Sequence, residues 1–281
     1  MKPCCETLKA PPASDKIGSL SVCVLASGSK GNAIHVSDGR TAILVDAGLS
    51  GIEIQRRMAA ADLSIADLSA IVVSHEHSDH VRGVGVLARR YGLPVHLSPG
   101  TEEAARGAIG HIPEISHFRI GRRFAIGDLR IHPFATSHDA RDPGGFTIAV
   151  NGCKIGIATD LGIATGMVRQ HLAGCALLVI EANHDPRMLL EGPYPWPLKQ
   201  RIKGRDGHLS NQDAGRLLTE LAHDALRHVI LAHLSEINNT PDKARATVER
   251  TLETVACRFR LHVARQDCCS EVLTVAPGRV G

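Results

Sequence analysis

A dense group of potential metal ligands constrains this chain more than any other feature. Four histidine or aspartate side chains fall within the six residues His75-Glu76-His77-Ser78-Asp79-His80. The group directly follows the apolar segment Ala70–Val73, which predicts a buried strand. Imidazole nitrogens and carboxylate oxygens suit Zn²⁺, Mn²⁺ and Fe²⁺. The pattern therefore predicts a metal site on the loop that follows this strand.

The spacing within this group favours two metal ions over one. In an extended loop His75 and His77 project to one side, while Asp79 and the adjacent His80 can turn toward a second point. Two ions about 3.5–4 Å apart would hold an attacking oxygen between them and lower the pKa of bound water toward ~7. A bridging hydroxide would then be available at neutral pH, which favours a hydrolase.

The expected secondary structure indicates an α/β fold with two mixed sheets. Strands are predicted at Leu20–Ala26, Ala33–Val36, Thr41–Asp46, Ala70–Val73 and Pro94–Leu97, and then at Arg123–Ile126, Leu129–Phe134, Phe146–Val150, Cys153–Ala158, Ala176–Glu181, His228–Ala232, Phe259–Ala264 and Glu271–Val275. Helices are predicted from Gly51 (capped by Ser50) to about Ala60, at Gly83–Tyr91, after a cap at Thr101, at Thr165–Leu172, after Ser210, and after Thr240-Pro241. Hairpin turns are expected at Gly127-Asp128 and Asn151-Gly152. Two blocks of strands and helices predict two sheets packed face to face with helices outside, an αββα sandwich.

Length and composition fit one large domain. The 281 residues are 43% hydrophobic, enough for a sizeable core. Residues 1–19 are polar and aperiodic, so a flexible tail is expected before a single domain at 20–281. The N-terminus lacks an apolar signal region, and no run approaches the ~18 apolar residues of a membrane span. We therefore expect a cytoplasmic protein without a membrane partner.

Charge and aromatic content say little about a substrate. The net charge of +3 permits an anionic substrate without requiring one. Aromatic residues make up only 3% of the chain, with one tryptophan. The chain therefore has too few aromatic rings for a surface on which successive bases stack. If nucleic acid is the substrate, the protein should recognise it mainly through contacts with the sugar-phosphate backbone.

The group from His75 to His80 resembles the signature of the metallo-β-lactamase-fold hydrolases, and the resemblance extends along nearly the whole chain. It implies that fold, with Asp46 in Leu44–Gly48 supporting the metal loop. It also implies three more ligands, each after a predicted strand: His138, Asp160 and His233. The first metal would take His75, His77, His138 and Asp160, and the second would take Asp79, His80, Asp160 and His233.

The implied ligands narrow the choice of activity. Asp160 argues against lactam hydrolysis, because the β-lactamases proper replace the bridging carboxylate. His77 argues against the flavodiiron oxidoreductases, which carry Glu at that position. Ester hydrolysis remains, by phosphodiesterases and nucleases or by thioesterases.

Other segments resemble one branch, the YycJ (WalJ) group, from about residue 20 to 275. The matching segments are Ala26–Asn32, Glu181–Asp185, Gly192–Ile202 and Gly207–Asn211. The resemblance implies a DNA exonuclease acting from the 5′ side, related to ribonuclease Z and the cyclic phosphodiesterases. The implied cofactors are two divalent metal ions, Zn²⁺ or Mn²⁺, with Fe²⁺ also suitable.

A basic segment precedes a second candidate catalytic histidine. Four cations fall within seven residues, Lys199, Arg201, Lys203 and Arg205, shortly before His208. Cations beside the N-terminus of a helix suit phosphate binding, so we expect these four to bind substrate, although a solvated basic loop is the simpler alternative. Ribonuclease-Z-like enzymes carry a histidine near this point. The resemblance therefore implies that His208 binds or protonates the leaving oxygen, with Asp79 also handling protons.

Two alternatives to a nuclease stay open. One is a small-molecule (cyclic) phosphodiesterase or a glyoxalase-II-like thioesterase, whose pocket would be closed. The other is a metal-binding regulatory protein without catalytic turnover. The complete ligand set argues against the second, because a decayed site would be expected to lack at least one ligand.

Overall fold

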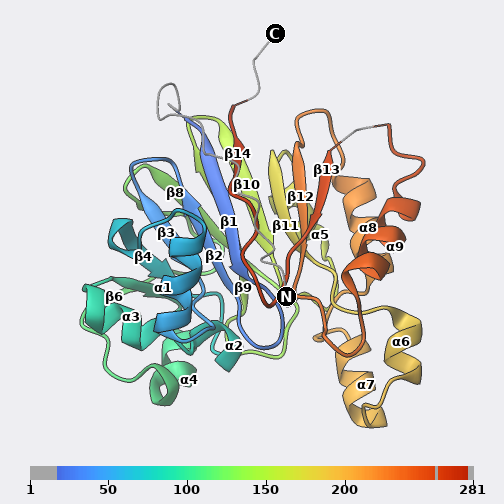
Figure 1. Ribbon diagram of the computed structural model, residues 1–281, viewed down its shortest axis with the longest axis horizontal. Coiled ribbons are helices and arrows are strands. Elements are labelled where there is room, and N and C mark those ends of the chain that lie inside the picture. The colour runs from blue at the N-terminus through green and yellow to red at the C-terminus, as the bar shows by residue number, and fades with distance from the viewer. Residues whose placement is uncertain (1–17, 257–258, 278–281) are drawn as a thin grey trace.

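The computed structural model describes residues 18–256 and 259–277. Two seven-stranded sheets pack face to face, and helices cover the outer surface of each sheet (Figure 1). This confirms the αββα sandwich predicted from the sequence. The predicted N-terminal tail lies outside the described residues except for Gly18 and Ser19. In the part of the chain that is described, no helix is long and apolar enough to cross a membrane.

Each sheet is built from one half of the chain, apart from a single strand. The first sheet has the order β14 (Leu273–Val275), β1 (Leu20–Ala26), β2 (Ala33–Ser37), β3 (Ala42–Val45), β4 (Leu68–Val72), β5 (Val95–Leu97) and β6 (Ile115–His117). The second has the order β13 (Arg260–Val263), β12 (His228–Ala232), β11 (Leu177–Glu181), β10 (Cys153–Ala158), β9 (Gly144–Val150), β8 (Leu129–Ala135) and β7 (Phe124–Ile126). Strands β3 to β6 are parallel, as are β10 to β13.

The helices divide between the two outer faces. On the first sheet lie α1 (Gly51–Ala60), the 3₁₀ turn η1 (Ile65–Asp67), α2 (Ser78–Val81), α3 (Val84–Tyr91) and α4 (Pro99–Ile109). On the second lie α5 (Gly166–Leu172), α8 (Asn211–Leu221) and α9 (Pro241–Thr251). Two further helices, α6 (Pro186–Glu191) and α7 (Trp196–Lys203), extend from one end of the sandwich (Figure 1).

Three apolar clusters correspond to the three interfaces between the layers. One lies between the sheets and contains Phe146 and Ile148 of β9 opposite Val22 and Val24 of β1. The other two lie between each sheet and its helices. The buried residues of each sheet face both ways, which explains the near-continuous apolar runs of β4, β11 and β12.

Most helix caps and turns predicted from the sequence are present in the structure. Ser50 caps α1 through a bond from the backbone N–H of Glu53, and Asn151-Gly152 forms a turn with positive φ at both residues. The prediction that Thr101 caps a helix was wrong. Ser98 is the cap of α4, because Pro99 at the first helical position starts the helix three residues earlier.

The arrangement of the strands brings several loops to one edge. The carboxyl ends of the parallel strands β3 and β4 lie at the same end of the sandwich as those of β10, β11 and β12 (Figure 1). Backbone bonds connect the loops of the first sheet: Asn32 N–H donates to Asp79 O (2.7 Å) and Ala47 N–H donates to His80 O (2.8 Å). The loops that carry the motif are therefore held in one place by the main chain.

Gly48→Ala should disrupt this contact between loops. A Cβ at Gly48 would lie 1.6 Å from the backbone oxygen of Asp79 and 2.6 Å from the nitrogen of Asn32. Because backbone atoms cannot move aside cheaply, we expect a loss of ~1–3 kcal/mol in the free energy of unfolding, measured in urea. Gly107→Ala is the matched control, since nothing lies within 4 Å of its Cβ and alanine favours the α4 helix. A Gly48→Ala protein as stable as the control would contradict this account.

Candidate metal centre

Three residues of the predicted site have a backbone conformation that is unusual for their type. Asp46, Asp160 and His233 have φ of 61°, 55° and 55°, in the left-handed region. Asp46 and His233 directly follow β3 and β12, and Asp160 lies two residues after β10. Such conformations cost energy for residues other than glycine and cluster at functional sites, although Asp62 and Asn151 of this chain adopt them in turns. The strain therefore marks the shared edge of the two sheets as the candidate site.

The first group of ligand atoms comes from three histidines. Nδ1 of His77 lies 3.1 Å from Nε2 of His75 and 3.2 Å from Nε2 of His138. His75 and His77 come from the loop after β4, and His138 comes from the loop after β8. These nitrogens are close enough to bind one cation together.

The second group contains Asp79, His80 and His233. Oδ2 of Asp79 lies 3.5 Å from Nε2 of His80 and 3.4 Å from Nε2 of His233. The short helix α2 begins at Ser78, so Asp79 and His80 lie on a helical turn and not on the extended loop expected from the sequence. The turn still directs their side chains to a point separate from that of His75 and His77.

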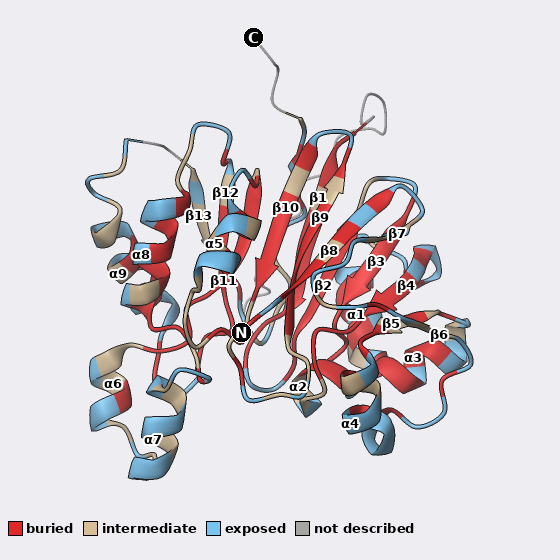
Figure 2. Ribbon diagram, turned by 180° about the vertical axis from the view of Figure 1, so that it is seen from behind, coloured by how far each residue is buried: buried red, intermediate tan, exposed pale blue. Residues whose placement is uncertain are grey.

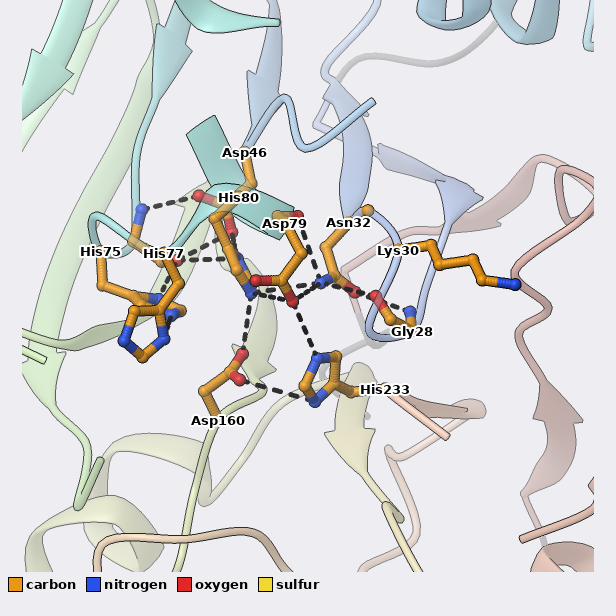
Figure 3. Close-up of polar contacts among 12 residues, drawn as sticks. Gly28, Lys30, Asn32, Asp46, His75, His77, Asp79, His80, Asp160 and His233 are labelled. Atoms are coloured by element: carbon orange, nitrogen blue, oxygen red, sulfur yellow. Dashed lines mark hydrogen bonds and ion pairs between the residues drawn. The ribbon is translucent and has the colours of Figure 1, made fainter. Parts of the chain in front are cut away.

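Asp160 lies between the two groups (Figure 3). Its Oδ1 is 3.6 Å from Nε2 of His138 and its Oδ2 is 3.2 Å from Nε2 of His80. The side chain is almost fully buried. A carboxylate in this position can contribute an oxygen to each group.

Most of the histidine rings in the two groups also contact a residue outside the groups through their second ring nitrogen. Nδ1 of His80 lies 2.8 Å from Asp46 Oδ2, and Nδ1 of His75 lies 2.9 Å from the hydroxyl oxygen of Ser74, which donates to the same carboxylate oxygen of Asp46. Nδ1 of His138 faces the carbonyl of Gly207 at 3.3 Å. In each of these three rings the other nitrogen, Nε2, faces the other ligand atoms of the cluster. A histidine whose outer nitrogen is fixed by a carboxylate or carbonyl is the usual arrangement around a metal.

The predicted glycine-rich turn also contributes to the site. The segment Ser27–Asn32 joins β1 to β2, and Nδ2 of Asn32 donates to Oδ2 of Asp79 at 3.2 Å. Gly28 N–H donates in turn to Oδ1 of Asn32 at 2.9 Å (Figure 3). The turn therefore orients the Asp79 carboxylate toward His233.

The donor set fits metal ions in charge as well as in geometry. Oδ2 of Asp160 is buried, and among the described residues it contacts only the ring nitrogen Nε2 of His80, at 3.2 Å and without the geometry of a good hydrogen bond. Burial and the neighbouring His80 hold the pKa of His75 well below its usual range, so this ring is neutral, the form that binds metal. Burial also disfavours charge on His80 and His233, but Asp160 and nearby carboxylates outweigh it and hold the pKa of both well above the usual range. The cluster thus concentrates negative charge that cations would neutralise.

Glu181 was not assigned a role from the sequence, but it has a central position. This last residue of β11 is fully buried, and its Oε1 lies 2.8 Å from Nδ1 of both His208 and His233. Its Oε2 accepts bonds from the backbone N–H of Leu161 and Leu209. Burial would raise the pKa of Glu181, but the two histidines outweigh it and lower the pKa to about 2. Glu181 is therefore an ionised carboxylate that orients one predicted ligand and one predicted catalytic residue.

His208 lies beside the ligand cluster and partly faces solvent. Its ring centroid is 5.1 Å from that of His138 and 5.2 Å from that of His233. Burial lowers the pKa of His208, but Glu181 raises it by more, and the net result is a raised pKa. The ring can therefore carry a proton close to the cluster.

The four predicted substrate-binding cations differ in their surroundings. They lie on α7 and the turn after it, and not on a loop. Nζ of Lys199 donates to the carbonyl of Leu190 at 2.7 Å, and Arg201 forms an ion pair with Asp139 at 2.5 Å. Lys203 and Arg205 are exposed and form no ion pair with a described residue.

Comparison with known proteins identifies the family. A sequence profile of the β-lactamase superfamily domain matches residues 41–234. The chain is 41% identical over 236 residues to exodeoxyribonuclease YycJ of Bacillus anthracis, covering 83% of this chain and 89% of that protein. The chain belongs to the YycJ/WalJ group of the β-lactamase superfamily. Exodeoxyribonuclease WalJ of Streptococcus pneumoniae serotype 2 (strain D39) is 37% identical over 237 residues, covering 82% of this chain and 87% of that protein.

A solved structure supports the fold of the superfamily independently. The metallo-β-lactamase fold protein YhfI from Bacillus subtilis aligns with a TM-score of 0.68 and 18% identity, over 90% of this chain and 99% of that one. At this identity the likeness shows the fold alone. The metallo-β-lactamase fold predicted from the sequence is thereby confirmed.

Glu181→Gln should weaken metal binding while keeping the fold. The amide oxygen can still accept from Leu161 and Leu209, but the charge that holds His208 and His233 is lost. We expect metal affinity or activity to fall about 10- to 100-fold, as is typical when the outer partner of a metal-binding histidine is removed. Metal content by elemental analysis, kinetics and urea unfolding measure this. Unchanged metal content and activity would show that Glu181 only fills space.

Proposed function

We propose that this protein is a phosphodiesterase that uses two metal ions and acts on DNA as an exonuclease. One observation carries the proposal: two groups of ligand atoms converge on the shared carboxylate of Asp160. A shared carboxylate between two adjacent sites is suited to the pair of metal ions that many nucleases and phosphatases use. The choice of DNA is supported by the relatives that are named exodeoxyribonucleases.

We assign the ligands to two ions. The first would be held by His75, His77, His138 and Asp160, and the second by Asp79, His80, Asp160 and His233. The mixed nitrogen and oxygen donors suit Zn²⁺ and Mn²⁺, and also Fe²⁺. When bound, such ions would polarise the phosphodiester and make a water molecule a stronger nucleophile at neutral pH.

The remaining residues orient the ligands and handle protons. Asp46 fixes His80 and, through Ser74, His75, while Glu181 fixes His233. His208 is partly exposed beside the cluster, so it is placed to donate a proton to the leaving oxygen or to bind it. Asp79, which also contacts Asn32, is placed to accept a proton from the attacking water. These roles require no covalent intermediate on the protein.

The basic segment would contact the DNA backbone. Lys203 and Arg205 have free charges, whereas Lys199 and Arg201 are engaged by Leu190 and Asp139. We therefore assign phosphate binding first to Lys203 and Arg205, with the other two holding the helix in place. We propose a cytoplasmic location, as expected from the sequence, and a DNA substrate is compatible with it.

His77→Ala or Asp79→Ala should abolish metal-dependent cleavage of DNA while leaving the chain folded. Each change removes one ligand but leaves the three apolar clusters intact. Digestion of labelled DNA and the metal content of each variant provide the measurements. His111→Ala, at an exposed position outside the site, is the control. Full activity in either ligand variant would exclude this metal centre as the catalytic site.

The polarity of digestion can be tested with end-labelled DNA. Acting from the 5′ side, the enzyme should release a 5′ label as a short product early, while a 3′ label stays on long fragments until late in the reaction. Labelled RNA and a chromogenic phosphodiester should be tested in parallel. Hydrolysis of the chromogenic ester without cleavage of DNA would favour the small-molecule phosphodiesterase. Bound metal without hydrolysis of any ester would favour a regulatory protein.

A further inference from the structure

The helices α6 and α7 form an arm that contributes little to the core. Both lie beyond the end of the sandwich in two opposite views (Figures 1 and 2). None of the residues of α7 is buried, and α6 buries only Leu189. A helix normally owes its stability to one face buried against a core. The exposure of α7 therefore suggests that the arm serves for contact with another molecule.

The arm is attached directly to the loops of the metal centre. Arg201, in the middle of α7, forms an ion pair with Asp139, the neighbour of the proposed ligand His138. The backbone N–H of His208 donates to the carbonyl of Ile202 at 2.9 Å. The end of α7 at Arg201 and Ile202 and the turn after it therefore lie beside the loops of the metal centre, while the opposite face of the helix is exposed.

The only tryptophan of the chain stands at the start of this helix. Trp196 is 59% exposed, although tryptophan is a large side chain that proteins usually bury in good part. Pro195 and Pro197 flank it and restrict the backbone on both sides. The ring is thus exposed on a stiff support, about 8 Å along the helix axis from Arg201.

The charges around the ring favour a polyanion as the partner. Trp196 and Lys203 are seven residues apart and therefore project from the same face of α7. From Gly192 to Arg205 the chain has four cations and no acidic residue. An aromatic ring among cations is the combination that binds single-stranded nucleic acid, where the ring stacks on a base and the cations contact phosphates.

We propose that the exposed face of α7 binds single-stranded DNA that leads to the metal centre, with Trp196 stacked on one unpaired base and Lys203 contacting the backbone. The proposal rests on the nuclease function. It adds a residue, Trp196, that favours single-stranded over double-stranded DNA. A base inside a duplex is covered on both faces by its neighbours, so away from the ends of a duplex only an unpaired base can stack on this ring. One exposed ring serves one base, which agrees with the low aromatic content of the chain.

The single tryptophan allows a direct measurement of this contact. The metal-loaded protein is titrated with a single-stranded oligonucleotide whose phosphorothioate linkages resist cleavage, and the tryptophan fluorescence is followed. We expect saturable quenching, because the stacked base contacts the only indole of the chain. In Trp196→Ala, measured by fluorescence anisotropy of a labelled oligonucleotide, affinity should fall about 5- to 150-fold, while Trp196→Phe retains most of it.

Three controls separate this proposal from the nuclease function itself. Hydrolysis of a small chromogenic phosphodiester should be unchanged in Trp196→Ala, because that ester has no neighbouring base to stack. Ile52→Ala, which removes an even more exposed apolar side chain from α1, should not change DNA binding. Binding of a covalently closed circular duplex, which has no end on which the ring could stack, should be much less sensitive to Trp196→Ala than binding of the single strand.

Two results would overturn the proposal. One is fluorescence that does not respond to DNA, and the other is equal affinity of the wild type and Trp196→Ala for the single strand. If the enzyme still cleaves DNA in either case, the nuclease function stands and only the role of the arm is rejected. Absence of cleavage in the wild type would instead reject the nuclease function.

Discussion

The buried carboxylate of Asp160 is the feature on which the arrangement of the site depends. It is only 3% exposed, and an uncompensated charge in such a place costs several kcal/mol. The first sheet supplies His80 and the second supplies His233, the two rings whose pKa Asp160 raises, to compensate it. Because the compensating rings come from both sheets, the charge joins the two halves of the sandwich at this edge. Metal binding at the same point should therefore stabilise the whole fold, since a site assembled from both sheets does not exist in the unfolded chain.

The strained backbone and the outer partners of the rings have a common explanation. A histidine at the end of a strand can reach a metal only if the chain turns sharply there, and the positive φ of His233 provides that turn. The cost is offset by bonds that hold the ring once it is in place: Glu181 contacts Nδ1, and the hydroxyl of Ser27 accepts from the backbone N–H at 2.7 Å. Asp46 combines both features, since it has positive φ and orients His80 and Ser74. The geometry of the proposed ligands is thus maintained by residues outside the proposed ligand set.

Features that depend on neighbouring residues could be predicted from the sequence, whereas features that depend on residues far apart in the chain could not be predicted from local patterns. The group His75–His80 is local, and the Asn151-Gly152 turn and the Ser50 cap are local as well, so their residue types suffice. The two-sheet architecture was predicted from the order of strands and helices, but the distant ligands were predicted only through family resemblance, because only the folded chain brings them together. Glu181 was not recognised, since it ends an apolar strand, and its partners His208 and His233 are 27 and 52 residues away. The helices of the arm were not predicted because they are short, rich in proline and lack an apolar face with helical period.

There is a physical reason why cleavage and recognition of an unpaired base would lie in different parts of the molecule, the metal centre and the arm formed by α6 and α7. Every nucleotide presents the same phosphodiester, so a site built from His, Asp and metal ions cannot distinguish a paired strand from an unpaired one. Discrimination requires contact with a base, and the residues around the cluster are carboxylates and imidazoles that are already engaged with one another. The exposed indole of Trp196 can make that contact, and the ion pair between Arg201 and Asp139 fixes its distance from the cleavage site. The residues of the arm that do not bond to these loops can vary without disturbing the ligands, so the choice between single- and double-stranded DNA and the chemistry of cleavage can be set independently within one fold.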